Sequence, residues 1–186
     1  MKRITTLLAA IISMAFMNQA SATHAIVEVT TAGQLNSVVE VANCDSITIS
    51  GNLNRNDFDF IRTQMPNLVY LNLRKVTVPE NKLPNSGLYE MKSLKEVMLP
   101  DNLETIGNSA FIYCSNLKDI SFPETLVTIE YNAFYHSGLS EVTFPANLQT
   151  ISDAAFYECY DLKTVSYTHL RAPATGAYLV CRLLLE

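Results

Sequence analysis

Leu94-Lys-Glu-Val97-Met-Leu99-Pro100 is the first of three closely similar stretches that decide the fold of this chain. The second is Leu117-Lys-Asp-Ile120-Ser-Phe122-Pro123, and the third is Leu139-Ser-Glu-Val142-Thr-Phe144-Pro145. Their starts are 23 and 22 residues apart. Each stretch is followed by a Leu-x-x-Ile segment and then by an Ala-Phe pair, and the third residue after the Phe is Cys114, Ser137 or Cys159. Repetition at so many positions indicates a chain built from structural repeats.

Less regular copies lie on both sides of these three. Leu68-x-x-Leu71-x-Leu73 and Ile47-x-Ile49 precede them, and a further copy opens at Leu162-Lys163-Thr164 before the pattern is lost. A period of about 20 to 29 residues with an L-x-x-L-x-L core is typical of leucine-rich repeats.

Alternation within one repeat predicts a short strand. Val97 and Leu99 alternate with Glu96 and Met98, so one side of the strand points into the coil and the other into solvent. The following Pro ends the strand because it cannot donate a ladder hydrogen bond. Leu-x-x-Ile then bends the chain back, and Ala-Phe-x-x-Cys predicts about one helical turn with Phe and Cys on its inner side. One coil cannot enclose a core, whereas stacked coils with parallel strands roughly 4.8 Å apart can.

The full pattern, L-x-x-[IV]-x-[LF]-P-x-x-L-x-x-I-x-x-x-A-F-x-x-C, closely resembles the BspA-like leucine-rich repeats of bacterial surface and secreted proteins of Bacteroidetes type. Three complete copies run from Leu94 to Asp161. The resemblance implies an α/β leucine-rich-repeat solenoid, with short parallel strands on one face, turns and single helical turns on the other, and a helical N-terminal cap. It also implies a protein-binding module that acts in cell-surface adhesion or in host or glycoprotein interaction.

The N-terminal part of the mature chain, 23–45, is expected to form this cap, followed by a solenoid of about five coils over 46–164. Thr30 or Thr31 can cap a helix over 32–41, in which apolar residues recur at near-helical spacing. Such a helix would cover the open end of the first coil, as solenoid termini require. The run Asp57-Phe58-Asp-Phe60-Ile61 predicts a second short helix under the first strand.

The first 22 residues have the pattern of a secretory signal peptide. Met1-Lys2-Arg3 is followed by an apolar run to Phe16 and by a small-residue site that ends at Ala22. The alternative is a membrane anchor, which usually needs about 20 apolar residues. No later segment is long enough to span a bilayer. The expected location is therefore secreted or at the cell surface, with no membrane span in the mature chain.

The last segment, 165–186, departs from the repeats. Its two ends resemble a translated sequencing-library adapter, which predicts a non-native tail and a natural protein that continues past Thr164. The alternative is a native C-terminal cap, which Tyr167 supports by standing at the position of Phe122 and Phe144 in the repeats.

Charge excludes two classes of partner. The 186 residues carry a formal net charge of −5, and residues 23–164, with nine basic and 17 acidic side chains, carry −8. Nucleic acid and anionic membrane surfaces require clustered Lys and Arg, so neither is an expected partner.

The cysteines and histidines indicate packing and not chemistry. Cys114 and Cys159 are two coils apart, roughly 9 to 10 Å, whereas a disulfide needs Cα atoms within about 7 Å. We expect both to be buried thiols that fill a coil corner, as Ser137 does between them, while Cys44 could be free or pair elsewhere. His136 is the one histidine within the repeats, and a Cys-His site would need exposed thiols.

No catalytic, cofactor-binding or metal-binding residues are therefore predicted, and the chain is not expected to be an enzyme. The sequence has no His-Glu-x-x-His, no G-x-S-x-G and no phosphate-binding glycine loop. Leu83-Pro-Asn-Ser-Gly87 looks like a sortase motif, but its position in the middle of the chain favours a loop between coils.

The candidate binding face is the solvent side of the sheet, where alternation places nine side chains. They are Thr48, Tyr70, Asn72, Glu96, Met98, Asp119, Ser121, Glu141 and Thr143. The acidic residues Glu96, Asp119 and Glu141 form a ladder of like charges on adjacent strands, which is destabilising unless compensated. The basic residues Lys95, Lys118 and Lys163 run alongside the ladder. One interpretation is an ordinary solvated face. The other is a recognition strip for a basic or polar partner, with Tyr70 and Met98 as apolar anchors.

Two other roles stay open beside a binding module for a protein or glycoprotein. The solenoid could be a structural spacer, or an accessory region of a larger exported protein, such as a hydrolase, whose C-terminal part is missing. The sequence indicates no oligomeric state.

Overall fold

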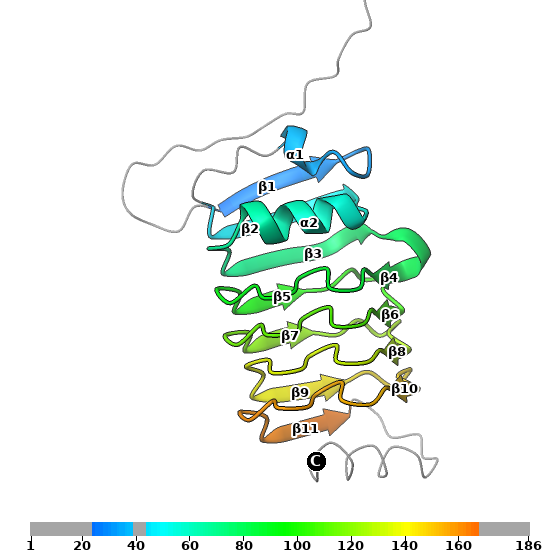
Figure 1. The fold of residues 1–186 in the computed structure, drawn as a ribbon. Coiled ribbons are helices and arrows are strands. Elements are labelled where there is room, and N and C mark those ends of the chain that lie inside the picture. Colours follow the sequence, from blue (N-terminus) through cyan, green and yellow to red (C-terminus); the bar gives the residue numbers. More distant parts are fainter. Residues whose placement is uncertain (1–23, 39–43, 168–186) are drawn as a thin grey trace, which may run out of the picture.

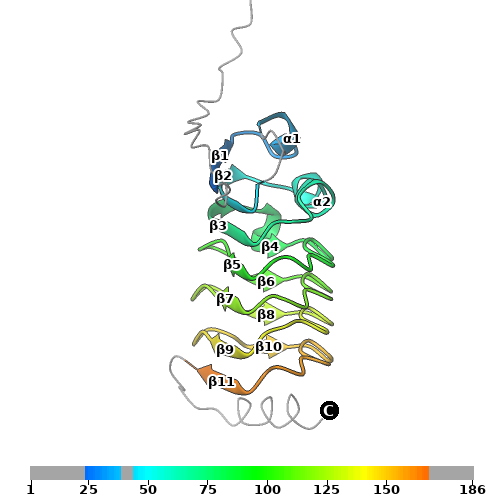
Figure 2. The ribbon, with the colours of Figure 1, turned by 90° about the vertical axis from the view of Figure 1, so that its left-hand side faces the viewer.

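The computed structural model describes residues 24–38 and 44–167, which stack as successive coils into an elongated solenoid (Figure 1). The predicted signal peptide lies outside the described residues, and so do 39–43 and residues 168–186 of the predicted tail. The predicted fold is confirmed, because short parallel strands line one face of the solenoid and turns line the opposite face (Figure 2).

One strand from each coil lies along one side of the solenoid, and we call this set of strands the main sheet, although it divides into two hydrogen-bonded parts. Its parallel order is β1-β2-β3-β5-β7, and β9 and β11 form a separate parallel pair beyond β7. The strands are β1 (His24–Val29), β2 (Ser46–Asn52), β3 (Tyr70–Thr77), β5 (Glu96–Met98), β7 (Asp119–Ser121), β9 (Glu141–Phe144) and β11 (Thr164–Tyr167). Alternation along them buries one side of the sheet, as the sequence predicts.

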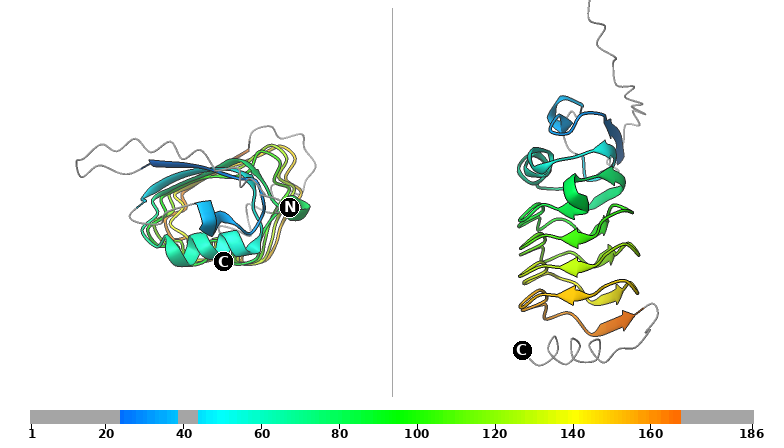
Figure 3. Two further views of the ribbon diagram at one scale, coloured as in Figure 1. Left: turned by 90° about the horizontal axis from the view of Figure 1, so that it is seen from above. Right: turned by 90° about the vertical axis from the view of Figure 1, so that its right-hand side faces the viewer.

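A second parallel sheet, which the sequence analysis did not predict, runs along another side of the solenoid (Figures 1 and 3). Its strands are the two-residue segments β4 (Lys82–Leu83), β6 (Thr105–Ile106), β8 (Thr128–Ile129) and β10 (Thr150–Ile151). A 3-10 turn, η1 (Pro79–Asn81), precedes β4. The Leu-x-x-Ile segment therefore bends the chain and also ends in a two-residue strand. These short strands can pair because the same Thr-Ile pair occurs at the same place in consecutive coils.

The third side of each coil is a set of hydrogen-bonded turns around the buried Phe. The Cys114 amide donates to the Phe111 carbonyl over 3.2 Å, and the Phe111 amide donates to Ala133 of the next coil over 2.7 Å. Ser109 and Tyr113 have φ of 55° and 60°, so these residues are not regular helix. Two left-handed residues, four positions apart, let the chain reverse within one coil while each coil keeps hydrogen bonds to the next.

The core is a set of identical positions stacked along the solenoid. Phe111 and Phe134 stack with ring centroids 5.1 Å apart, and Phe134 and Phe156 stack at 5.0 Å. All three rings are buried, as are Val97 and Ile106 from the two strand positions. Burying a side chain of this size contributes about 1.5 to 3 kcal/mol, and each coil supplies the surface that its neighbour covers.

The N-terminal end contains both helices. Helix α1 (Leu35–Val38) lies within the helix predicted over 32–41, but it begins later. Helix α2 (Arg55–Gln64) confirms the second predicted helix. Strand β1 was not predicted; it pairs with β2 and extends the sheet by one strand.

One buried carboxylate joins the two helices. Asp57 accepts hydrogen bonds from the backbone amides of Gly33 (2.6 Å), Leu35 (2.9 Å) and Asn54 (2.8 Å). The last of these closes a capping box with the Asn54 side chain at the start of α2. The first amide of α1, that of Leu35, is therefore bound by Asp57, and not by Thr30 or Thr31 as the sequence suggested.

At the other end, β11 extends three residues into the segment predicted to be non-native. Tyr167 pairs with Phe144, with ring centroids 5.5 Å apart, which is the position that the native-cap alternative gives it. The origin of 165–186 stays a prediction, and the sequence of the encoding DNA would test it.

Replacing Asp57 by Ala is expected to lower the free energy of unfolding by about 2 to 4 kcal/mol, because three amides lose a charged acceptor and one of these hydrogen bonds, that of Leu35, is buried between α1 and α2. Chemical denaturation followed by circular dichroism measures the change. Asp59→Ala is the matched control on the same helix. Its exposed pairs with Arg55 and Arg62 predict a change within about 1 kcal/mol. Equal losses in the two variants would contradict this role of Asp57.

Candidate functional site

The structure places all nine predicted face residues on the solvent side of the main sheet. Neighbouring strands hold them in lateral register, with Thr48 beside Asn72, Tyr70 beside Glu96, and Met98 beside Ser121. None of the nine is buried, whereas Ile47, Leu71 and Val97, which alternate with them, are. The face is thus a continuous polar strip across successive coils.

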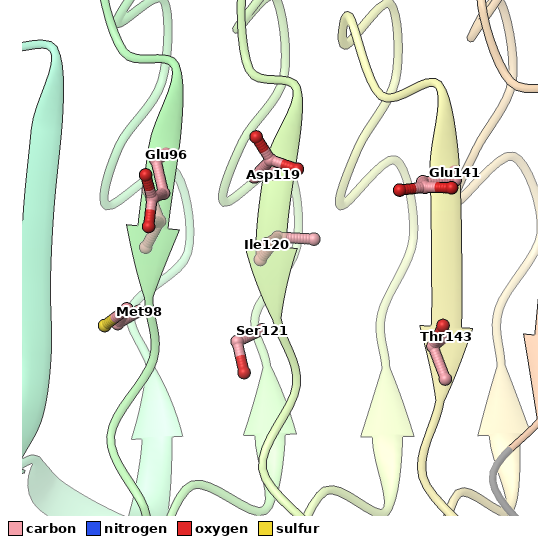
Figure 4. Close-up of a pocket in the computed structure, with 8 residues that line it drawn as sticks. Glu96, Met98, Asp119, Ile120, Ser121, Glu141 and Thr143 are labelled. Atoms are coloured by element: carbon pink, nitrogen blue, oxygen red, sulfur yellow. The ribbon is translucent and has the colours of Figure 1, made fainter.

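A hollow of about 250 Å³ opens on this strip over β5, β7 and β9 (Figure 4). Its lining residues are Glu96, Val97, Met98, Asp119, Ile120, Ser121, Glu141 and Thr143. Six of them were predicted face residues; Thr48, Tyr70 and Asn72 lie outside the hollow. Sequence reasoning missed Val97 and Ile120, since alternation assigns both to the core.

Ile120 is less buried than the residues at its repeat position in the coils on either side. The equivalent Val97 and Val142 are buried, but Ile120 is only half-buried, and its side chain extends into the space between β7 and β9 (Figure 4). The hollow therefore has an apolar floor beneath polar walls.

The floor is open because β7 and β9 are not hydrogen-bonded as sheet neighbours. In the turn before β9, Gly138 alone separates Ser137 from Leu139, whereas two residues separate Cys114 from Leu117 and Cys159 from Leu162. This shorter turn explains the 22-residue spacing. A Cβ atom at Gly138 would lie 2.1 Å from the Ser115 carbonyl oxygen, so the turn passes too close to its neighbour for any larger residue.

Three carboxylates surround the hollow. Glu96 and Asp119 are direct neighbours in the ladder between β5 and β7, and Glu141 stands on β9 across the gap (Figure 4). Within the described part of the chain, no ion pair involves any of the three. The hollow is therefore anionic.

The lysines that run alongside do not pair with this ladder. The Lys118 ammonium donates to the Gly138 carbonyl over 2.9 Å and to the Asp161 carboxylate over 2.7 Å. It thus joins three coils across the missing sheet hydrogen bonds, and the bond from Lys118 lowers the pKa of Asp161. Among the residues that the structure describes, Lys95 and Lys163 form no ion pair with a carboxylate of the ladder either.

The rest of the strip is polar and aromatic. The Tyr70 hydroxyl donates to the Met98 sulfur over 3.4 Å, so the two predicted apolar anchors touch at the edge of the hollow. His24 on β1 lies 2.6 Å from the Ser46 hydroxyl and 3.2 Å from that of Thr48. Sequence reasoning missed His24 because β1 was not recognised as a strand.

The repeat thiols are packing groups, as predicted. Cys114 donates to the Leu88 carbonyl over 3.1 Å, and Cys159 donates to that of Phe134 over 3.0 Å. Both thiols are buried and neither forms a disulfide. Burial raises the pKa of Cys114 to about 12 and also raises the pKa of Cys159, so neither is a nucleophile near neutral pH.

Two other sequence features have structural roles. His136 lies 3.3 Å from the Glu158 carboxylate, and 43% of its side chain is exposed, so it does not form a Cys-His site with the buried thiols. The sortase-like stretch 83–87 ends β4 and forms the turn that follows it.

No metal site or membrane helix is present in the described residues. Over 24–38 and 44–167, no group of three His, Cys, Asp or Glu side chains is arranged to hold a metal ion. The helices described there are also too short and too polar to cross a bilayer.

Comparison with known proteins agrees with this architecture. Residues 81–179 match the family model described as "BspA type Leucine rich repeat region (6 copies)". A solved leucine-rich repeat protein from Bacteroides ovatus shares the fold, with 19% identity and a TM-score of 0.54 over 88% of this chain and 41% of that chain. A comparison with curated proteins gives no significant match.

Two further structures are similar over smaller parts of this chain. A leucine-rich repeat protein from Bacteroides capillosus is 30% identical, with a TM-score of 0.44 over 47% of this chain and 63% of that chain. The pneumococcal vaccine antigen PcpA is 18% identical, with a TM-score of 0.45 over 68% of this chain and 43% of that chain. The chain spans less than two thirds of the length of each of these three structures.

Cys114 is expected to resist alkylation in the folded protein and to react once the chain is denatured. Below the ordinary thiol pKa of 9.0, the group is protonated in both states. Between pH 9.0 and about 12 only the unfolded thiol ionises, so the contribution of this group to stability falls as pH rises through that range. Iodoacetamide labelling at pH 8.5 with and without urea, read by peptide mass spectrometry, checks the protection. Equal labelling in both samples would show that the thiol is accessible.

Proposed function

The chain belongs to the BspA-type leucine-rich-repeat family, and from this premise we propose that it is a module that binds a basic protein partner through the solvent face of its main sheet. The observation that carries the proposal is the hollow over β5, β7 and β9, in which three carboxylates without an ion pair among the described residues surround an apolar floor. Leucine-rich-repeat domains generally mediate protein interactions, and the matched relatives are repeat proteins of a generally non-enzymatic kind.

The energetics of the hollow favour a cationic occupant. Like charges opposite one another on neighbouring strands are destabilising, by a few tenths to about 1 kcal/mol a pair. A Lys or Arg side chain from a partner would relieve this repulsion and lay its aliphatic stem on Ile120. Such complementarity chiefly determines specificity and the rate of association.

The strip beside the hollow supplies the second part of the proposed contact. Tyr70 and Met98 are half-buried and touch each other, so a partner can cover them with little loss of side-chain freedom. Tyrosine is among the residues that most often dominate the energy of protein interfaces. Thr48 and Asn72 add hydrogen-bonding groups on the same side of the sheet.

We place this binding outside the cell, in adhesion or in contact with host proteins and glycoproteins. The signal-peptide pattern of residues 1–22 and the family membership support this location. If the module were instead a spacer, or an accessory region of a larger exported protein, the face would have no ligand of its own. The experiment below separates these possibilities.

Neutralising the ladder with E96Q, D119N and E141Q is expected to weaken binding to a basic partner by tenfold or more, because the hollow loses its charge and keeps its shape. The partner is sought among immobilised extracellular-matrix proteins and host glycoproteins, and binding is measured by biolayer interferometry. Wild-type binding should weaken as salt rises from about 0.1 to 1 M, where the screening length falls from about 10 to 3 Å. The free energy of unfolding should stay the same or rise, since repulsion is removed.

The matched control is E80Q, D101N and E124Q, which makes the same change of charge at exposed positions outside the hollow. This variant should bind like the wild type. Equal binding by a folded ladder variant, or equal losses in both triple variants, would show that the hollow is not the recognition site. Absence of any ligand for the wild type would favour the spacer.

A further inference from the structure

A row of aromatic residues lies on the turns that stack below α2, on the side of the solenoid opposite the main sheet; Figure 2 shows the backbone of these turns. Two of the rings are exposed and the others are half-buried. This row plays no part in the face described above. Its members, which we call the tyrosine patch, are Tyr89, Tyr113, Tyr135, His136, Tyr157 and Tyr160.

The rings contact one another continuously along the solenoid axis. Tyr89 and Tyr113 meet edge to face with centroids 6.2 Å apart, and Tyr113 and Tyr135 do so at 5.4 Å. Tyr135 and Tyr157 are stacked at 5.7 Å. Tyr160 extends the patch through an edge contact of 6.0 Å with His136.

The repeat explains why these rings lie outside. Five of the six follow a buried core residue of the same repeat position, Leu88, Phe111, Phe134 or Phe156, by one or two residues, and Tyr160 follows Phe156 by four. The turn that points the core side chain inward thus points these residues outward. Tyr113 and His136 hold left-handed backbone, with φ of 60° and 53°, a conformation uncommon for residues other than Gly, Asn, Asp and His. The patch thus sits on backbone that the hydrogen bonds between coils fix.

Two rings of the patch are exposed, although the packing of the core does not require a large ring at these positions. Tyr157 is 42% exposed and Tyr160 is 77% exposed. The three stacked phenylalanines already fill the interior of the same coils. Large apolar groups gathered on a surface mark interaction sites more often than isolated ones do.

The charged residues around the patch indicate what kind of partner it would bind. Glu90 and Glu158 occupy the same repeat position at its two ends. Glu158 pairs with His136 over 3.3 Å, and its hydrogen bond with the Tyr135 hydroxyl raises the pKa of that group. In the described residues, neither glutamate pairs with Lys or Arg. Arg62, near Tyr89, is already paired with Asp59 over 3.3 Å.

We propose that the tyrosine patch is a second docking surface, which binds arginine side chains of a protein partner. Aromatic ring faces and carboxylates both carry negative potential, and a guanidinium can stack on a ring while it donates to a carboxylate. A single-stranded nucleic acid would also stack on tyrosines, but its phosphates need a basic groove, which this acidic surface does not provide. Tyr157 and Tyr160 are the most exposed rings of the patch, so they are the residues that we expect to contact the arginines.

The test uses the full chain with E96Q, D119N and E141Q in place, so that the hollow cannot contribute, and with isotope-labelled tyrosines. The probe is a synthetic peptide in which three arginines alternate with glycine. The matched control peptide carries citrulline, which keeps the shape of arginine and lacks its charge. The expected result is that the arginine peptide shifts the ring signals of the patch and binds at least fivefold more tightly than the citrulline peptide.

Variants of the rings complete the test. Y157A with Y160A should weaken binding of the arginine peptide about tenfold, while Y157F with Y160F, which keeps the rings, should stay within about twofold. An unchanged melting temperature in each variant excludes unfolding. Equal binding of the citrulline peptide, unchanged binding by the alanine variant, or ring shifts with neutral oligosaccharides but not with arginine would each overturn the proposal. None of these outcomes depends on the sheet-face proposal, because the hollow is neutralised throughout.

Discussion

Every feature of this molecule depends on one constraint: a single coil of about 22 residues cannot bury its own apolar side chains. These side chains become buried only when the next coil packs against them. The stacked phenylalanines, the two strand ladders and the hydrogen bonds from one turn to the next are three expressions of this constraint. Because each contact joins neighbouring coils, inward positions repeat strictly, while outward positions are free to carry function. Among the described residues no coil precedes the first one, and α1 and α2, joined through Asp57, lie at that end.

The same constraint explains why a small change in the repeat opens a candidate site. Removing one residue from the turn before β9 leaves the inner stack intact, since Phe134 still contacts both Phe111 and Phe156. It does separate β9 from β7 in the sheet, so Ile120 becomes partly exposed between them. Lys118 crosses this gap with its bonds to Gly138 and Asp161. The core therefore stays packed although β7 and β9 are separated, and this separation forms the hollow on the sheet face.

Much of this architecture could be predicted because repetition makes each position readable several times. The buried set, the strands of the main face and the buried thiols follow from alternation and spacing. The second sheet did not follow, because two residues are too few to show a period, although the recurrent Thr-Ile pair was visible. Strand β1 was missed because it belongs to an irregular first coil. The tyrosine patch was missed because Tyr89, Tyr135 and Tyr157 share one repeat position but Tyr113 stands at the next.

The sequence by itself determined the solenoid, its period, the inward residues and the acidic strip on its sheet, since these depend on the order of apolar and polar residues along one coil. Only the tertiary structure decided what lies between coils. Which lysine pairs with which carboxylate, whether Ile120 is covered, and which rings meet on the outer turns all depend on contacts between residues about 22 or more positions apart. A repeat pattern gives the place of a residue within its coil, but the one-residue difference before β9 acts through the alignment of one coil on another.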